Sequence, residues 1–449
     1  MMNTEAISPV ARGDSAARKA TPNARTRRVA LRFILMIGVL SFFADSTYEG
    51  SRSILGPYLG SLGVTATAIG IIMGLGELLG YGLRLVSGRW ADTTGKFWPI
   101  AISGYLLQMA SVPALALTHS WLSAAVLIIL ERVGKATRNP PRDVMLSHAG
   151  KQVGGYGRAF GLHEALDQFG ALVGPLLVAA VLAHRNEYRL AFALLLIPAV
   201  INIALVLIAR WLYPRPQDLE PPPPPNVQGK GLPGLYWVYL AGAALVAAGF
   251  ADYPLIAYHW SRHAVVPGHW VAIFYSVAMA VSGTGSLLFG RLFDRFGFKV
   301  LIVLTVLASA FAPLVFLGGF AVALVGAAVW GLGIGVHESI IPAAVSPMVA
   351  PERRTSAFGL FTAGYGIFWF AGSVAIGVLY DRSVCAAIVF CVATQLLAVP
   401  VFLWVGRRSA HTTRHTDPRA TPVALEGCRA ALHVLSSVTP RFSPIPKIL

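Results

Sequence analysis

The feature that most constrains the fold is a succession of long apolar stretches, broken only by short polar segments. A bilayer-spanning helix needs about 20 mainly apolar residues. The chain therefore predicts spanning helices at roughly 31–58, 66–87, 98–117, 121–138, 158–183, 188–212, 235–260, 269–289, 299–318, 320–342, 356–380 and 384–405. Only 12% of its residues are charged, against about 25% in soluble proteins. A membrane β-barrel would instead show strands of about ten residues with alternating polarity. We expect an all-α integral membrane protein with about twelve transmembrane helices.

A proline-rich segment divides these stretches into two sets of six. It runs from Pro214 to Pro233 and includes Pro221–Pro225, which cannot continue a helix. The sequence thus predicts a disordered basic tail (1–29), a first six-helix bundle (30–213), a cytoplasmic linker (214–233), a second bundle (234–406) and a second disordered basic tail (407–449). No small-residue cleavage site follows the apolar run 33–43, so we interpret it as an uncleaved first helix and not as a signal peptide.

The basic residues indicate the orientation. The net charge is +16, which is also typical of nucleic-acid-binding proteins. Here, however, Lys and Arg concentrate in the tails and in alternate polar segments, including Lys135 and Arg138 at the end of the fourth stretch and Arg142 after it. Because Lys and Arg are retained on the cytoplasmic side, both termini and the linker are predicted to be cytoplasmic, in a multi-pass protein of the inner (plasma) membrane. We expect contact with the lipid bilayer and none with nucleic acid.

Short matches suggest that the two halves repeat each other. Residues 43–45 and 250–252 both read Phe-Ala-Asp, an offset of 252 − 45 = 207, and Glu131 and Glu338 have the same offset. Residues 159–162 and 357–360 both read Ala-Phe-Gly-Leu, an offset of 357 − 159 = 198. We therefore expect two six-helix bundles related by a pseudo-two-fold axis along the membrane normal.

Two loops carry the spacing G-x-x-x-D-x-x-G followed by Lys, one in each half. They begin at Gly88 and Gly290 and resemble the loop motif of the major facilitator superfamily, except that Thr93 and Phe298 interrupt the usual basic pattern. The resemblance covers nearly the whole chain between the tails and implies a secondary transporter. It further implies a conformational latch on the cytoplasmic side, formed by Gly88, Asp92, Gly95, Lys96, Gly290, Asp294, Arg295 and Gly297.

The fifth apolar stretch contains Gly170, Gly174 and Pro175 in the spacing G-x-x-x-G-P. It is similar to a motif of the proton-coupled drug exporters in that superfamily, although Val178 and Ala179 replace the glycines that usually follow. Glycines four residues apart are also common where two membrane helices pack closely. The motif therefore favours export but leaves a purely packing role open.

Several charged residues fall inside the apolar stretches, where they must pair or face a cavity. A buried carboxylate can take up a proton near neutral pH, and an Arg that pairs with it opposes this. Static buried pairs are an alternative for each residue. The proton-coupling candidates are Asp45, Glu49, Glu131, Arg132, Glu164, Asp167 and Asp252.

Aromatic residues and one more Arg accompany these charges. They could bind an apolar or cationic substrate, or act only in packing. The substrate-cavity candidates are Tyr48, Arg52, Tyr253, Tyr258, Tyr365 and Trp369.

The expected function is proton-coupled export of small molecules by alternating access, with a small-molecule substrate and protons as partners and a monomer as the working unit. Proton-coupled uptake of an organic anion or metabolite, and a non-transporting membrane sensor, remain alternatives. An enzyme is not expected, because phosphate-loop and zinc-protease signatures are incomplete and Cys385, Cys391 and Cys428 are too few for a metal framework. We therefore expect no catalytic residue, no cofactor and no metal.

Overall fold

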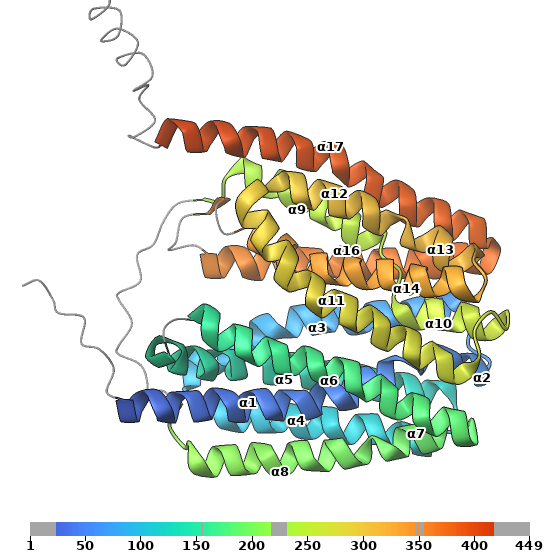
Figure 1. Ribbon diagram of the computed structural model, residues 1–449, viewed down its shortest axis with the longest axis horizontal. Helices are drawn as coiled ribbons and strands as arrows, with labels where there is room; N and C mark the ends of the chain where they lie inside the picture. The colour runs from blue at the N-terminus through green and yellow to red at the C-terminus, as the bar shows by residue number, and fades with distance from the viewer. Residues whose placement is uncertain (1–23, 154–155, 217–230, 346–347, 350–353, 417–449) are drawn as a thin grey trace, which may run out of the picture.

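The computed structural model describes residues 24–153, 156–216, 231–345, 348–349 and 354–416. This part of the chain contains helices and no strand. The helices run side by side along the long axis of the molecule, in two groups that correspond to the two halves (Figure 1). Residues 1–23 and 417–449 of the expected tails, and 217–230 of the expected linker, lie outside the described residues. An all-helical fold is what a bilayer demands, since lipid offers no partner to a free backbone group.

The N-terminal half contains helices that follow the predicted stretches closely. The helix that corresponds to the fourth predicted span, α5 (Trp121–Gly150), is longer than expected and continues through Pro140 and Pro141. The elements are α1 (Ala24–Arg52), α2 (Leu55–Ser61), α3 (Ala66–Thr94), α4 (Phe97–Ala114), η1 (Leu115–Leu117), α5 (Trp121–Gly150), η2 (Lys151–Val153), α6 (Tyr156–Arg185), α7 (Tyr188–Leu194) and α8 (Leu196–Leu212).

The C-terminal half contains a similar succession of long and short helices. Its elements are α9 (Gly234–Ala248), α10 (Tyr253–Arg262), α11 (Gly268–Phe296), α12 (Phe298–Ser309), α13 (Phe311–Leu317), α14 (Phe320–Gly335), the π-helix η4 (Val336–Ile340), α15 (Ile341–Ala343), α16 (Arg354–Arg382) and α17 (Val384–Thr416). Both described chain ends lie at the same end of the molecule (Figure 1), which we call the terminal end, and the opposite end is the distal end.

Within the described residues, eleven helical segments are long and apolar enough to cross a membrane. The expected fourth span lies in α5, which has 30 residues but carries Glu131, Arg132, Lys135, Arg138 and Arg142. These charges remove α5 from the apolar set, although it packs between α3, α4 and α6. Large apolar side chains face outward elsewhere, as in Trp211, which is 80% exposed. A lipid-facing exterior accounts for such exposure, and the chain is a multi-pass membrane protein.

Six of the expected spans are not continuous α-helices. The third ends in the 3₁₀ turn η1, and the sixth and ninth are interrupted at Leu195 and Ala310. The other three interruptions lie closer to the charged residues described below.

The first span breaks at Ser53 and Ile54, between α1 and α2. The seventh breaks between Ala248 and Tyr253, where Pro254 occupies the first turn of the next helix. The tenth contains the π-helix η4, and π-helical turns are frequent at functional sites.

The first residues of corresponding helices in the two halves show that part of the predicted repeat is wrong. Tyr156 and Arg354 begin α6 and α16 and are 354 − 156 = 198 residues apart, the same offset as the Ala-Phe-Gly-Leu match. Leu55 and Tyr253 begin α2 and α10 and are also 253 − 55 = 198 residues apart. At that offset Asp252 corresponds to Ile54 and not to Asp45, so the Phe-Ala-Asp match at 207 is coincidental. The repeat itself holds for these helices.

Candidate transport site

A ladder of polar pairs joins α1 to α5 in the N-terminal half. Asp45 accepts a hydrogen bond from Arg138 at 3.2 Å, and Glu49 lies 3.9 Å from Lys135. At the terminal end of the ladder, Arg142 donates to Ser41 at 3.4 Å. The helices run in opposite directions, so side chains three or four residues apart on each helix meet in order. The predicted end of the fourth span at residue 138 is wrong, because α5 continues to Gly150 and carries Lys135, Arg138 and Arg142 along one face.

Arg52 lies at the distal end of this ladder and connects the two halves. Its guanidinium is 3.2 Å from Glu77 of α3 and 3.5 Å from Asp252, which belongs to the C-terminal half. A second link is the hydroxyl of Tyr275 of α11, which donates to Glu49 at 2.5 Å. These contacts cross the interface between the bundles, so a relative movement of the bundles would have to break them.

Glu77 and Glu131 complete the N-terminal side of this network. Arg132 lies 3.0 Å from Glu77 and 3.6 Å from Glu131, and Gln108 donates to Glu131 at 2.9 Å. In this network, four carboxylates (Glu49, Glu77, Glu131 and Asp252) face three cations (Arg52, Arg132 and Lys135). Among these directly paired groups the carboxylates outnumber the cations by one, in surroundings where an uncompensated charge is costly. Arg84 also acts electrostatically on Glu77 but makes no ion pair with it.

The break in the seventh span positions Asp252. Its carboxylate accepts hydrogen bonds from Ser373 at 2.7 Å and from Trp369 at 3.2 Å. The break also frees backbone carbonyls, and side chains from neighbouring helices satisfy two of them. Gln395 donates to Gly249 at 3.1 Å, and Trp330 donates to Ala251 at 2.8 Å. Irregular backbone inside a membrane protein is tolerated only where protein or a cavity surrounds it.

Tyr48 is the aromatic centre of the network. The cations of Arg52, Arg132 and Lys135 lie 5.9, 5.0 and 3.6 Å from the centroid of its ring, and Arg52 also donates to its hydroxyl at 2.7 Å. Cations over an aromatic face are attracted by its quadrupole. Tyr48 was expected in the cavity, and it does lie at the centre of the charged residues.

The other cavity candidates are more scattered. Trp369 contacts Asp252, and Tyr365 hydrogen-bonds to His337 in the π-helix, so both border the centre. Tyr253 donates to the carbonyl of Val271 at 2.6 Å and is packed among aromatic rings. Tyr258 lines a cavity of about 400 Å³ at the distal end, beside Arg262. The structure therefore does not bring Tyr253 and Tyr258 to the charged centre.

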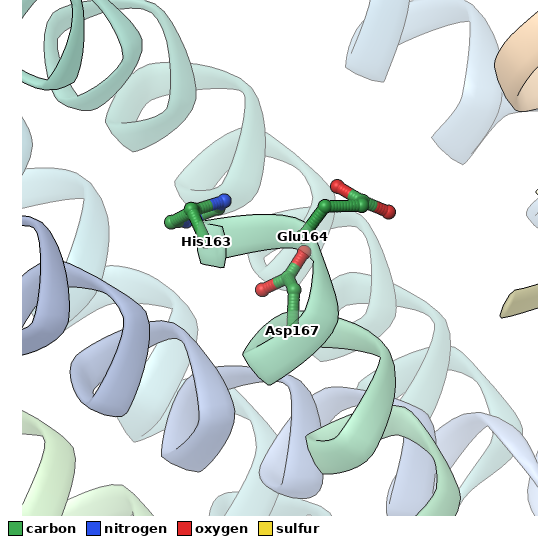
Figure 2. Close-up of side chains that lie close together, drawn as sticks. All are labelled: His163, Glu164 and Asp167. Carbon is green, nitrogen blue, oxygen red and sulfur yellow. The ribbon is translucent and has the colours of Figure 1, made fainter. Parts of the chain in front are cut away.

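Three polar residues of α6 form a second group, beside the terminal end of the ladder. Ligand atoms of His163, Glu164 and Asp167 lie within 4.8 Å of one another (Figure 2). His163 hydrogen-bonds to Ser41 at 2.8 Å, and Glu164 accepts from Gln168 at 2.9 Å. Asp167 interacts electrostatically with Asp45 and Arg142, which brings it into the same field as the ladder. Asp167, predicted from α6, therefore lies close to Asp45, predicted from α1.

Glu338 was not selected from the sequence as a site residue. The π-helix η4 presents it as an exposed side chain, although its electrostatic neighbours Glu164, Glu49, Lys135 and Arg52 all belong to the other half. Glu77 and Tyr275 were also missed. Glu77 could have been found from its position seven residues before Arg84, on the same helix face, whereas Tyr275 has no distinguishing sequence signal.

The halves are in contact at the distal end. Asp381 of α16 accepts hydrogen bonds from the backbone amides of Ala66 and Thr67, at 3.2 and 2.8 Å, and from the Thr67 hydroxyl at 2.6 Å. It therefore caps the first turn of α3 in the other bundle. Nearby, a Cβ on Gly56 would lie 1.8 Å from the carbonyl oxygen of Pro254, so the backbones of α2 and α10 touch. The distal side is closed in this structure.

The predicted latch residues lie at the terminal end. Asp92, Lys96, Asp294 and Arg295 are exposed, and neither carboxylate forms an ion pair with a described residue. Gly95 and Gly297 have positive φ angles of 65° and 59°, which confirms the tight turns expected from the motif. A Cβ on Gly88 would make an ordinary van der Waals contact with Pro140 of α5, at 3.4 Å, and one on Gly290 would meet nothing within 4 Å, so neither position requires glycine for helix packing.

The glycines of the fifth apolar stretch pack α6 against α1. A Cβ on Gly170 would lie 2.3 Å from the carbonyl oxygen of Phe42, and one on Gly174 would lie 2.2 Å from that of Ser46. Pro175 lies inside α6 without ending it. The packing role is thus visible in the structure, and it holds α6 close to the acidic face of α1.

Comparison with known proteins agrees with this architecture. The profile described as Major Facilitator Superfamily matches residues 34–261 and again 235–441. The uncharacterized protein Rv2265 of Mycobacterium tuberculosis is 40% identical over 376 residues, which cover 82% of this chain and 92% of Rv2265. The multidrug resistance protein MdtH of Aeromonas hydrophila is 28% identical over 201 residues, 44% of this chain and 49% of MdtH. The matched segment thus covers about half of each protein.

Solved structures show the same fold at low sequence identity. The crystal structure of peptide transporter POT in complex with sulfate superimposes with a TM-score of 0.66 at 14% identity, over 86% of this chain and 98% of that one. The family profile covers both halves, and its two matches overlap over residues 235–261. The chain therefore belongs to the major facilitator superfamily, and it is a membrane transporter and not an enzyme.

Proposed function

We propose that this transporter is a proton-coupled exporter of small molecules that works by alternating access, with its terminal end in the cytoplasm. The observation that carries the proposal is the charged centre at Arg52, because it joins the two halves and contains one more carboxylate than cations. A proton or a cationic substrate can neutralise the extra carboxylate. Either one changes the pairs that Arg52 and Glu49 make with the other half.

The coupling follows from these contacts. Protonation of Asp252 would weaken its attraction to Arg52, and protonation of Glu49 would weaken its hydrogen bond with Tyr275. Both events loosen the interface between the bundles, so proton occupancy and bundle movement are linked. Asp45 and Asp167 lie closer to the terminal end and offer a route by which a proton reaches or leaves the centre.

Two observations support the direction and orientation. The partial likeness to the multidrug resistance protein MdtH favours export. Arg and Lys residues are frequent where helices end or begin at the terminal end, for example Arg89, Lys96, Arg291, Arg295 and Lys299, which favours a cytoplasmic position for that end.

The test is a proton-flux measurement. Purified protein in liposomes that contain a pH-sensitive dye is challenged with a panel of cationic drugs and organic acids. We expect substrate-induced proton movement in the sense of antiport. We also expect this movement to be lost in Asp252→Asn and in Asp167→Asn, which remove the charge and keep the shape. The control Glu187→Gln changes an exposed acid and should behave like the unchanged protein. Unaltered flux in both Asn variants would contradict the proposal.

A second function is uptake of an organic anion together with protons. The three cations around Tyr48 favour it, because a carboxylate substrate could displace one of the internal acids from Arg52 or Arg132. The same liposomes distinguish the two functions, since symport moves protons with the substrate and antiport moves them against it. Proton movement with organic acids only, in the symport sense, would support uptake.

A further inference from the structure

We infer that the groove between α6 and α11 binds amphipathic cations taken from the inner leaflet of the bilayer. The inference rests on the proposed function, which it deepens by naming a substrate class and an entry site. The groove is a cavity of about 340 Å³, lined by both halves. It lies apart from the Arg52 centre, and the pairs described above do not involve its apolar walls.

The walls of the groove suit an apolar body. Leu172 and Phe169 of α6 face Met279 and Leu287 of α11 across it. Phe169 and Leu287 are each 59% exposed and form the rim. Phe169 lies seven residues, or two turns, before the exposed Leu176, so the rim belongs to the lipid-facing side of α6. Sites for drug-sized ligands are typically concave and apolar, with a few polar groups that set the orientation.

The polar groups of the groove offer acceptors and almost no free donor. The hydroxyls of Thr284 and Ser286 donate to backbone carbonyls, at 2.7 and 3.4 Å. The amide nitrogen of Gln168 donates to Glu164. What remains is the exposed carboxylate of Glu164 and the buried amide oxygen of Gln168, which has no partner among the described residues. A ligand that satisfies them must donate hydrogen bonds or carry positive charge.

Two carboxylates near Glu164, and an aromatic ring at the rim, favour a cationic ligand. Glu164 interacts electrostatically with Glu338 and with Asp167, so the polar end of the groove opens toward a region of several carboxylates. The ring of Phe169 stacks with that of Phe42, 6.2 Å between centroids, and presents an aromatic face at the rim. With the terminal end in the cytoplasm, the polar end of the groove lies in the half of the membrane that faces it, because Glu164 is only nine residues into α6. The apolar walls continue from there toward the middle of α6 and α11.

The experiment uses two probes of the same shape and opposite charge, tetraphenylphosphonium and tetraphenylborate. Their binding to the full-length protein in detergent is measured by equilibrium dialysis, with protein-free micelles as the blank. The unchanged protein should bind the phosphonium and not the borate. Glu164→Gln removes the charge, and Ala280→Trp fills the groove. Each should weaken phosphonium binding by about tenfold or more, the effect of losing one good interaction.

The control is Leu288→Trp, which adds the same bulk to the exposed face of α11 beside the groove and should bind like the unchanged protein. Unweakened binding in both Glu164→Gln and Ala280→Trp, equal binding of the borate, or no phosphonium binding by the unchanged protein would overturn the inference. Equal borate binding would identify the groove as a place for any apolar molecule, such as a lipid chain. The proposed function would survive each result if proton flux with other substrates were still lost in Asp252→Asn.

Discussion

At the residue scale, the charged side chains of α1 and α5 depend on each other. Arg138 has 0% exposure, and its partners are Asp45 at 3.2 Å, Gln108 at 2.5 Å and Tyr105 at 3.3 Å. A buried cation with this many partners is stable only while they remain, because removal of one partner leaves the other charge unpaired. The ladder therefore contributes to folding as well as to any movement of protons.

Arg138→Gln should destabilise the protein by about 3–5 kcal/mol, because it leaves the carboxylate of Asp45 buried without its cation. The double variant Asp45→Asn/Arg138→Gln should recover much of this loss, since two neutral amides can bond to each other. Thermal unfolding in detergent measures both. Equal unfolding temperatures for Arg138→Gln and the unchanged protein would mean that the pair contributes little.

Part of this site could be predicted from the sequence. Asp45 and Glu49 stand out as acids in an apolar stretch, and Asp252 as an acid before a Pro. Their partners could not be identified in the same way, because Lys135 and Arg138 lie at the predicted end of the fourth apolar stretch, where basic residues usually mark the cytoplasmic boundary of a span. Hydropathy locates helices through their lipid-facing surface, and it ends a helix too early where its surface faces other helices and carries charge. The spacing of three or four residues between the cations was the signal that could have corrected this.

At the element scale, the positions of the helices were predictable and their interruptions were not. Gly249 and Pro254 were visible signals for a break in the seventh span. The π-helix η4 has no such signal, because an extra residue in a turn is imposed by packing. The breaks place Asp252 and Glu338 beside the other half, so the features that were hardest to predict are those that position the charged centre.

The close approach of α1 and α6 depends on glycine. Gly174→Ala should destabilise the protein by about 1–3 kcal/mol, because the new methyl group would lie 2.2 Å from the carbonyl oxygen of Ser46 and push the helices apart. The matched control is Gly161→Ala in the same helix, where a Cβ meets nothing within 4 Å. It should leave the unfolding temperature unchanged or raise it slightly, because Ala favours a helix. An equal response of the two variants would contradict a packing role for Gly174.

At the scale of the whole molecule, the two ends of the bundle interface differ. The distal end is closed by Asp381, which caps α3, and by the contact between Gly56 and Pro254. At the terminal end, Asp92 and Asp294 are exposed. Alternating access requires a second state in which the distal contacts are broken, and the cap of α3 is one of the contacts that must be given up.

Asp381→Ala should therefore favour the state with an open distal end. Loss of a helix cap costs about 0.5–2 kcal/mol, and about 1 kcal/mol changes a population ratio roughly fivefold. Spin labels attached at Ser61→Cys and His263→Cys lie on opposite halves at the distal end. Pulsed electron paramagnetic resonance should show longer distances between these labels in Asp381→Ala than in the protein with Asp381. The native Cys385, Cys391 and Cys428 are first replaced by Ala. The neighbouring Arg382→Gln should leave the distances unchanged, and so would Asp381→Ala if the cap were irrelevant.

The exposed acids at the terminal end should act in the opposite sense. If Asp92 and Asp294 form their contacts only when the distal end is open, then Asp92→Ala or Asp294→Ala removes stabilisation from that state alone. We expect unfolding temperatures close to that of the unchanged protein, because both side chains are exposed in the structure. We also expect shorter distances between the distal labels and a loss of transport in liposomes.

In the double variant Asp92→Ala/Asp381→Ala the two shifts should offset each other, so the label distances should return toward those of the unchanged protein while transport stays impaired. Full transport by both single variants would mean that these loops take no part in the exchange between states.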